Sequence, residues 1–98
     1  MELLTQLELV DVTFEESKAV LTFLDEERGE IREVNFNKKS YDQEKGEFVN
    51  DPEKAEKVEA LCQEHFGLEF DRLAEAIGEK RDVYAYDRFN SLYEVKMV

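Results

Sequence analysis

A helix start and a helix stop near the middle of this chain limit its possible folds more than any other feature. Asp51 is a residue type that caps helices, Pro52 suits the first helical position, and Gly67 suits the position after the last turn. Side chains between them recur at helical spacing, at Ala55, Val58, Leu61, Cys62 and His65. A second, shorter helix is expected from Glu69 to Ile77, with an apolar stripe of Phe70, Leu73, Ala74 and Ile77.

Alternating apolar residues predict strands on both sides of this helical centre. The expected strands are 7–14, 19–24, 31–36, 82–87 and 92–98. Gly29 can supply the positive φ of the loop that joins the second strand to the third. The order β-β-β-α-α-β-β predicts a single α+β domain over residues 1–98. Its mainly antiparallel sheet of about five strands is packed on one face by two helices. Alternatively, the last hairpin forms a separate small sheet.

Two segments fit the alternation less well. The expected strand 7–14 is apolar on both parities at one end, which is typical of a strand covered on both faces there. Residues 41–49 read as a tight turn between two short extended pieces. We expect Tyr41, Phe48 and Val49 to anchor this segment to the core.

Acidic residues dominate the composition. The 98 residues include 25 acids and 13 bases, giving a formal net charge of −12, and 39% of the residues are charged. Such a charge disfavours free nucleic acid and anionic membrane surfaces as partners, because both need a surplus of Lys and Arg. It favours attraction to another protein with a basic surface.

The single cysteine, Cys62, has no partner in the chain for a disulfide, which fits a reducing compartment. Residues 1–6 lack the basic start and apolar run of a signal peptide, and no segment approaches the roughly 20 apolar residues of a membrane span. The expected location is therefore the cytoplasm.

The chain has few candidate catalytic or metal-ligating residues. Cys62 and His65 are three apart on the expected helix, but zinc needs three or four such ligands and the chain has no other Cys or His. No Gly-x-Ser-x-Gly turn and no glycine-rich phosphate loop is present. We therefore expect no enzyme activity, catalytic residues, metal or cofactor. A small hydrolase or metal-dependent enzyme is the remaining alternative, and it would need a pocket near Cys62 and His65.

Acids follow the first expected helix at Glu53, Glu56 and Glu59. They form either an ordinary solvated face or a surface that imitates the regular charges of nucleic-acid phosphates. In the second case the protein would occupy a basic groove of a nucleic-acid-binding partner.

The C-terminal hairpin is the second candidate surface, because it is rich in aromatic residues and nearly balanced in charge. Its candidate partner-binding residues are Tyr84, Tyr86, Arg88, Phe89 and Tyr93. Tyr84 and Tyr86 share a strand face and could meet Tyr93 across the hairpin. These aromatics either close the core or form an interface with a partner or a second copy. The alternative function is an accessory role on single-stranded nucleic acid, with Lys80, Arg81 and Arg88 nearby, joined in space by Lys38 and Lys39.

Residues 41–54 and 82–95 resemble segments of the small acidic proteins found in phages and conjugative elements of Gram-positive bacteria. That resemblance implies a small inhibitor or adaptor that works by binding a host protein. It assigns no site residue.

Overall fold

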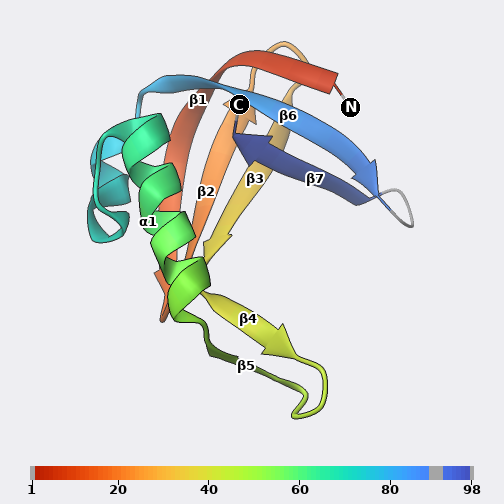
Figure 1. The fold of residues 1–98 in the computed structure, drawn as a ribbon. Helices are drawn as coiled ribbons and strands as arrows, with labels where there is room; N and C mark the ends of the chain where they lie inside the picture. The colour runs from red at the N-terminus through yellow and green to blue at the C-terminus, as the bar shows by residue number, and fades with distance from the viewer. Residues whose placement is uncertain (1, 89–91, 98) are drawn as a thin grey trace.

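The computed structural model describes residues 2–88 and 92–97, and side chains are described for residues 3–84. Figure 1 shows the chain as strands, then helices, then strands. The elements are β1 (Glu2–Glu15), β2 (Lys18–Asp25), β3 (Glu30–Asn37), β4 (Lys39–Asp42), β5 (Glu47–Asn50), α1 (Pro52–Phe66), the 3-10 helix η1 (Phe70–Ala76), β6 (Lys80–Arg88) and β7 (Leu92–Met97). The expected α+β class is confirmed.

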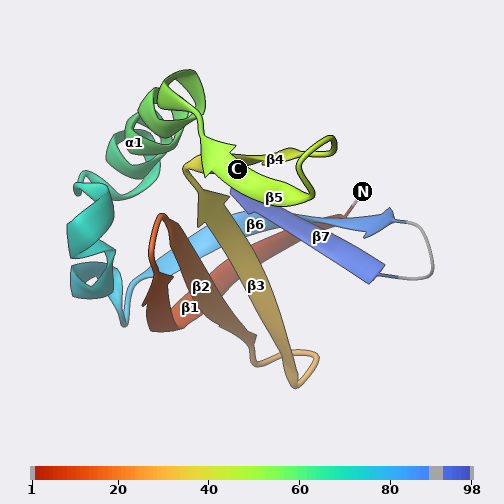
Figure 2. The same ribbon diagram turned by 90° about the horizontal axis from the view of Figure 1, so that it is seen from below.

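The larger sheet is antiparallel and has the order β3-β2-β1-β6-β7. It curls so that Cα atoms of its two outer strands, β3 and β7, come within 8 Å of each other. Since each neighbouring pair is antiparallel, β3 and β7 run in the same direction. This curled five-stranded sheet, with α1 and η1 before its strand β6, resembles the five-stranded, partly open barrel of OB-type domains (Figure 2).

The central strand, β1, is bent by two irregularities. Its register shifts between Leu4 and Leu7 in the pairing with β6, and between Leu9 and Asp11 in the pairing with β2. A shift of one residue reverses which parity faces inward. Cover on both faces was therefore the wrong prediction for this strand: Leu7 and Leu9 are buried before the second shift, and Val12, on the other parity, packs against the core after it, while Val10 and Phe14 are 37% and 41% exposed.

Alternation in β2 and β3 was predicted correctly. Ala19, Leu21 and Phe23 are fully buried, and Val34 and Phe36 pack beside them. On the helix, Val58, Cys62 and Phe66 complete the same core. Leu61, one of the residues expected at helical spacing, is instead 37% exposed.

Helix α1 begins and ends as expected. The Asp51 side chain accepts a hydrogen bond from the Lys54 amide, Pro52 starts the helix, and Gly67 ends it with a φ of +66°. Leu68 packs against the core just beyond the end.

The second helical segment was predicted with the wrong period. The structure has a 3-10 helix, in which every third residue lies on one side, so that Phe70, Leu73 and Ala76 are buried. Ala74 is exposed, and Ile77 is 46% exposed. The expected α-helical stripe is therefore replaced by one with a spacing of three.

The C-terminal hairpin belongs to the main sheet, because β6 pairs with β1. The separate small sheet is instead β4–β5, the segment expected to be a tight turn between extended pieces. None of the described helices is both long and apolar enough to cross a membrane.

Candidate functional site: an exposed aromatic hairpin

The β4–β5 hairpin projects from the barrel beside the start of α1 (Figures 1 and 2). Its loop is closed by Asp42, whose Oδ1 accepts hydrogen bonds from the amides of Glu44 at 3.0 Å and Lys45 at 3.2 Å. The amide of Gly46 donates to the Asp42 carbonyl at 2.8 Å, and Gly46 has a φ of +67°, which favours glycine. The loop therefore has a defined shape of its own.

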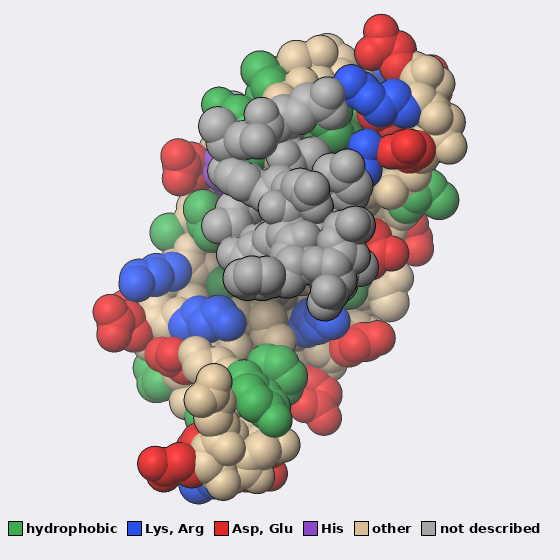
Figure 3. Space-filling view, turned by 90° about the vertical axis from the view of Figure 1, so that its right-hand side faces the viewer, with side chains coloured by type: hydrophobic (Ala, Val, Ile, Leu, Met, Phe, Trp, Pro, Cys, Tyr) green, Lys and Arg blue, Asp and Glu red, His purple; other side chains and the backbone are tan. Residues whose placement is uncertain are grey.

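Tyr41 and Phe48 are directly opposite each other across this hairpin. Their rings pack edge to face, with centroids 5.3 Å apart and planes at 66°. The expectation that they anchor the segment to the core was wrong, because Tyr41 is 57% exposed and Phe48 is 53% exposed. Figure 3, with the hairpin at the bottom, shows hydrophobic side chains on it next to charged ones of both signs.

The base of the hairpin is tied to α1. The Ser40 hydroxyl donates to Asp51 Oδ2 at 2.6 Å, and Lys54 Nζ donates to the Lys39 carbonyl at 2.7 Å. The pKa of Asp51 is lowered, first by the Ser40 hydrogen bond and then by the Lys54 amide. These bonds hold the hairpin at a fixed angle to the helix.

A hollow of about 560 Å³ lies between the hairpin and the β1–β2 turn. Its lining residues are Glu15, Glu16, Ser17, Lys18, Asn37, Lys39 and Phe48. The Lys39 ammonium pairs with the Glu16 carboxylate at 3.2 Å. Glu16 has a φ of +46°, in the left-handed region that favours glycine, so this turn carries backbone strain beside the hollow.

The three acids predicted on α1 differ in the structure. Glu53 and Glu56 are exposed. Glu59 is tied down: its Oε1 accepts from Lys38 Nζ at 2.6 Å and its Oε2 accepts from the Phe70 amide at 3.4 Å. The Lys38 hydrogen bond is the largest cause that lowers the pKa of Glu59. Glu59 therefore joins α1 to η1 and to Lys38, the residue between β3 and β4, and is not a free surface acid.

Most of the predicted C-terminal site lies outside the described side chains. Tyr84 is half-buried, the side chains of Tyr86, Arg88 and Tyr93 are not described, and Phe89 lies outside the described residues. The backbone register opposes Tyr86 to Glu94 and Tyr93 to Asp87. Tyr93 is therefore not the cross-strand partner of Tyr86.

Most of the bases of the predicted basic patch whose side chains are described are paired with acids. Lys38 pairs with Glu59, and Lys39 pairs with Glu16. Arg81 pairs with Glu79 at 2.9 Å and donates from Nε to the His65 carbonyl at 2.9 Å. Three of the five predicted bases are thus paired with acids, Lys80 is exposed, and the side chain of Arg88 is not described.

Cys62 is fully buried, and desolvation, followed by the charge of Glu59, raises its pKa to about 11. A high pKa makes a thiol a poor nucleophile and a poor metal ligand. His65 is half-buried. No group of three or more His, Cys, Asp or Glu residues that could hold a metal ion occurs among the described residues.

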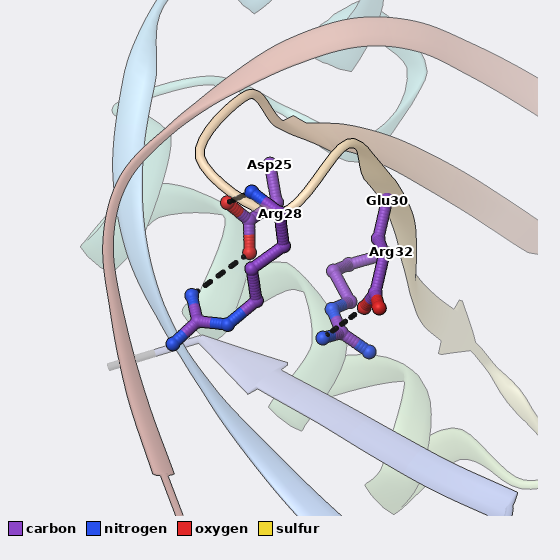
Figure 4. Close-up of polar contacts among 4 residues, drawn as sticks. All are labelled: Asp25, Arg28, Glu30 and Arg32. Carbon is purple, nitrogen blue, oxygen red and sulfur yellow. Dashed lines mark hydrogen bonds and ion pairs between the residues drawn. The ribbon is translucent and has the colours of Figure 1, made fainter.

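A second hollow, of about 290 Å³, lies at the bend of β1 and includes the buried Asp25. Asp25 is satisfied by Arg28, which donates to it from Nη1 at 3.1 Å and from its amide at 3.3 Å. Arg32 pairs with Glu30 two residues away on the same strand, β3 (Figure 4). The Asp25–Arg28 contacts hold the β2–β3 turn in place.

Sequence reasoning missed the exposure of Tyr41 and Phe48. The available signal was their symmetric placement about the Asp42–Glu47 turn, which makes them opposite neighbours on one face of a hairpin. No family model matches this chain, and no curated protein or solved structure matches it.

Proposed function

We propose that this protein is a non-enzymatic binding module that contacts a basic partner protein through the β4–β5 hairpin. The observation that carries the proposal is the pair Tyr41 and Phe48, two rings more than half exposed on a projecting element. Exposed aromatic side chains with an ordered backbone are typical anchors of protein interfaces. The charged residues around them resemble the polar rim of such an interface.

The hairpin is ordered before any partner arrives. Asp42 closes its loop, and Ser40 and Lys39 tie its base to α1. Association normally loses free energy when loops and side chains become ordered. An already ordered hairpin reduces that loss.

Charge selects the kind of partner. In the described part of the chain, many bases already pair with acids: Arg28 with Asp25, Arg32 with Glu30, Lys38 with Glu59, Lys39 with Glu16, Lys57 with Glu53, Arg72 with Glu75, and Arg81 with Glu79. The remaining surface has a surplus of carboxylates, consistent with the net charge of −12. Such a surface attracts a basic protein and repels phosphate.

The barrel itself gives little support to the alternative of single-strand binding. OB-type barrels bind oligonucleotides on the face of their second and third strands, where aromatic side chains stack on the bases. Here the outward residues of β2 and β3 are Lys18, Val20, Thr22, Leu24, Ile31, Glu33, Asn35 and Asn37, none of them aromatic. Asp11 lies beside Thr22 and adds a further negative charge.

The finer proposal is that the partner's basic surface is a nucleic-acid-binding groove. The exposed carboxylates of Glu53 and Glu56, on the helix that holds the hairpin, support it. An inhibitor or adaptor of a mobile genetic element would act in this way in the cytoplasm.

The test uses the immobilised protein, a cell lysate and two variants. We expect Tyr41→Ser/Phe48→Ser to lose the partner that the wild type retains. Ile77→Ser is the matched control, since it removes an apolar side chain of similar exposure, 46%, away from the hairpin. Binding should weaken at about 0.5 M NaCl, where charges on the surface are screened. A partner that binds the double variant as well as the wild type contradicts the proposal.

A further inference from the structure

In the described part of the chain the β4–β5 sheet has two strands, so each strand has one edge that faces away from its neighbour. Two-stranded sheets of this kind are marginally stable alone, and a third strand adds main-chain hydrogen bonds. The two edges of this hairpin differ in whether their backbone groups are already bonded.

The edge of β4 is blocked by side chains. The Lys39 amide donates to Asn37 Oδ1 at 2.9 Å, and the Lys39 carbonyl accepts from Lys54 Nζ at 2.7 Å. A further strand would have to displace both side chains to pair at this position.

The edge of β5 is open. Because the amide and carbonyl of Lys39 point outward, Lys39 and Asn50 form a non-hydrogen-bonded pair of the ladder. Such pairs alternate, so Tyr41 and Phe48 form the next one, and the amide and carbonyl of Phe48 also point outward. No described residue bonds to them.

Space and charge are available on the face of the hairpin that carries Lys39 and Phe48. These two residues line the hollow of about 560 Å³, which gives room for side chains of an incoming segment that point to this face. Glu47 and Glu15 are exposed and have no ion-pair partner among the described residues. Lys18 and Lys39 also line the hollow and balance Glu15 and Glu16, so the attraction for a cation comes from Glu47 and from the net charge of −12.

We propose that the outer edge of β5, Glu47–Asn50, is completed by an extended basic segment of the partner, which pairs with it as a third strand. This inference rests on the proposed function, since it specifies how the partner meets the hairpin. Charge favours a basic partner segment over a second copy of the chain, because two copies would each bring a charge of −12 and repel each other. Side chains of alternate residues in the segment would contact the Tyr41–Phe48 face.

The test titrates the full ¹⁵N-labelled chain with a synthetic peptide of alternating lysine and valine, about eight residues long, at low ionic strength. We expect amide shifts concentrated at Glu47–Asn50. Exchange of the Phe48 amide hydrogen should slow about tenfold, the effect of one added hydrogen bond. The exchange of the Phe48 amide hydrogen is measured on the wild-type chain, so this result holds even if a substitution disturbs the hairpin.

Two variants separate the edge from the ring. Phe48→Ala removes the ring but keeps the outward amide, and we expect it to weaken peptide binding several-fold. Phe48→Pro also removes the amide, which a strand tolerates at its edge, and should weaken binding about tenfold more. Equal binding by the two variants would overturn the inference.

Three further outcomes test the pairing of a partner segment with the β5 edge. Peptide shifts confined to β1–β3, or none at Glu47–Asn50, would overturn edge pairing. Protection of Phe48 that rises with protein concentration, without peptide, would assign the edge to a second copy. If edge pairing fails while Tyr41→Ser/Phe48→Ser still loses the lysate partner, the proposed function stands without this inference.

Discussion

The hydroxyl of Ser40 donates to the carboxylate of Asp51 at 2.6 Å, and the other oxygen of that carboxylate caps helix α1 through the Lys54 amide. One side chain therefore fixes both the start of the helix and the base of the hairpin. Removing the Asp51 carboxylate should therefore weaken both the start of α1 and the base of the β4–β5 hairpin.

We expect Asp51→Ala to lower the melting temperature by about 4–8 °C, the usual effect of losing a helix cap in a domain of this size. Ser40→Ala should lower it less, because the cap remains. Amide exchange in Lys39–Asp42 should accelerate in both variants, and thermal melts with hydrogen exchange measure the two effects. Unchanged exchange in Ser40→Ala would show that the hairpin is held by other contacts.

Glu59 should make stability depend on pH. Its folded-state pKa lies below the ordinary 4.5, so its contribution is present above pH 4.5 and is lost as the pH falls through the lower folded value. The side chain is 40% exposed, so the contribution should be at most about 1 kcal/mol. Urea melts should show that wild type loses more unfolding free energy than Glu59→Gln between about pH 5 and pH 3. Parallel pH curves would contradict this.

Cys62 should react slowly with alkylating reagents while the protein is folded. Burial raises its pKa from 9.0 to about 11, which lowers the thiolate fraction near pH 8 about 100-fold. Iodoacetamide labelling followed by mass spectrometry should be fast in guanidinium and slow in buffer. The raised pKa also means that the folded state loses stability as the pH rises from 9 to about 11. Rapid native labelling would show that α1 opens readily.

Glu16→Gly should stabilise the fold. Glycine relieves the cost of a φ of +46°, roughly 1 kcal/mol. The lost ion pair with Lys39 is worth little, since Glu16 is 84% exposed. We expect a higher melting temperature than for wild type, whereas Ser17→Gly, at a position without positive φ, should give no such gain. A lower melting temperature for Glu16→Gly would show that the ion pair outweighs the strain.

The sequence predicted those parts of the fold that depend on local chemistry. Asp51, Pro52 and Gly67 mark the helix because capping acts within one turn. The alternation of β2 was readable because a sheet face is buried or exposed along its whole length.

Three features were not readable, each for a physical reason. The bend of β1 depends on pairing with β6, whose residues lie far along the chain; the Gln6 amide, for example, donates to Asp82. The choice between α and 3-10 geometry at 70–76 depends on tertiary packing. Apolar character does not show whether Tyr41 and Phe48 reach the core or a partner, so the candidate site had to come from the structure.

Folding order is one consequence of the place of β1 in the sheet. The first strand of the chain is the central one, and its partner on one side, β6, begins only at Lys80. The meander β1–β2–β3 can assemble from nearby residues, while β1–β6 pairing must close a long loop and should come late. During synthesis, an apolar strand edge on β1 therefore waits for the last fifth of the chain, exposed to aggregation until β6 joins it.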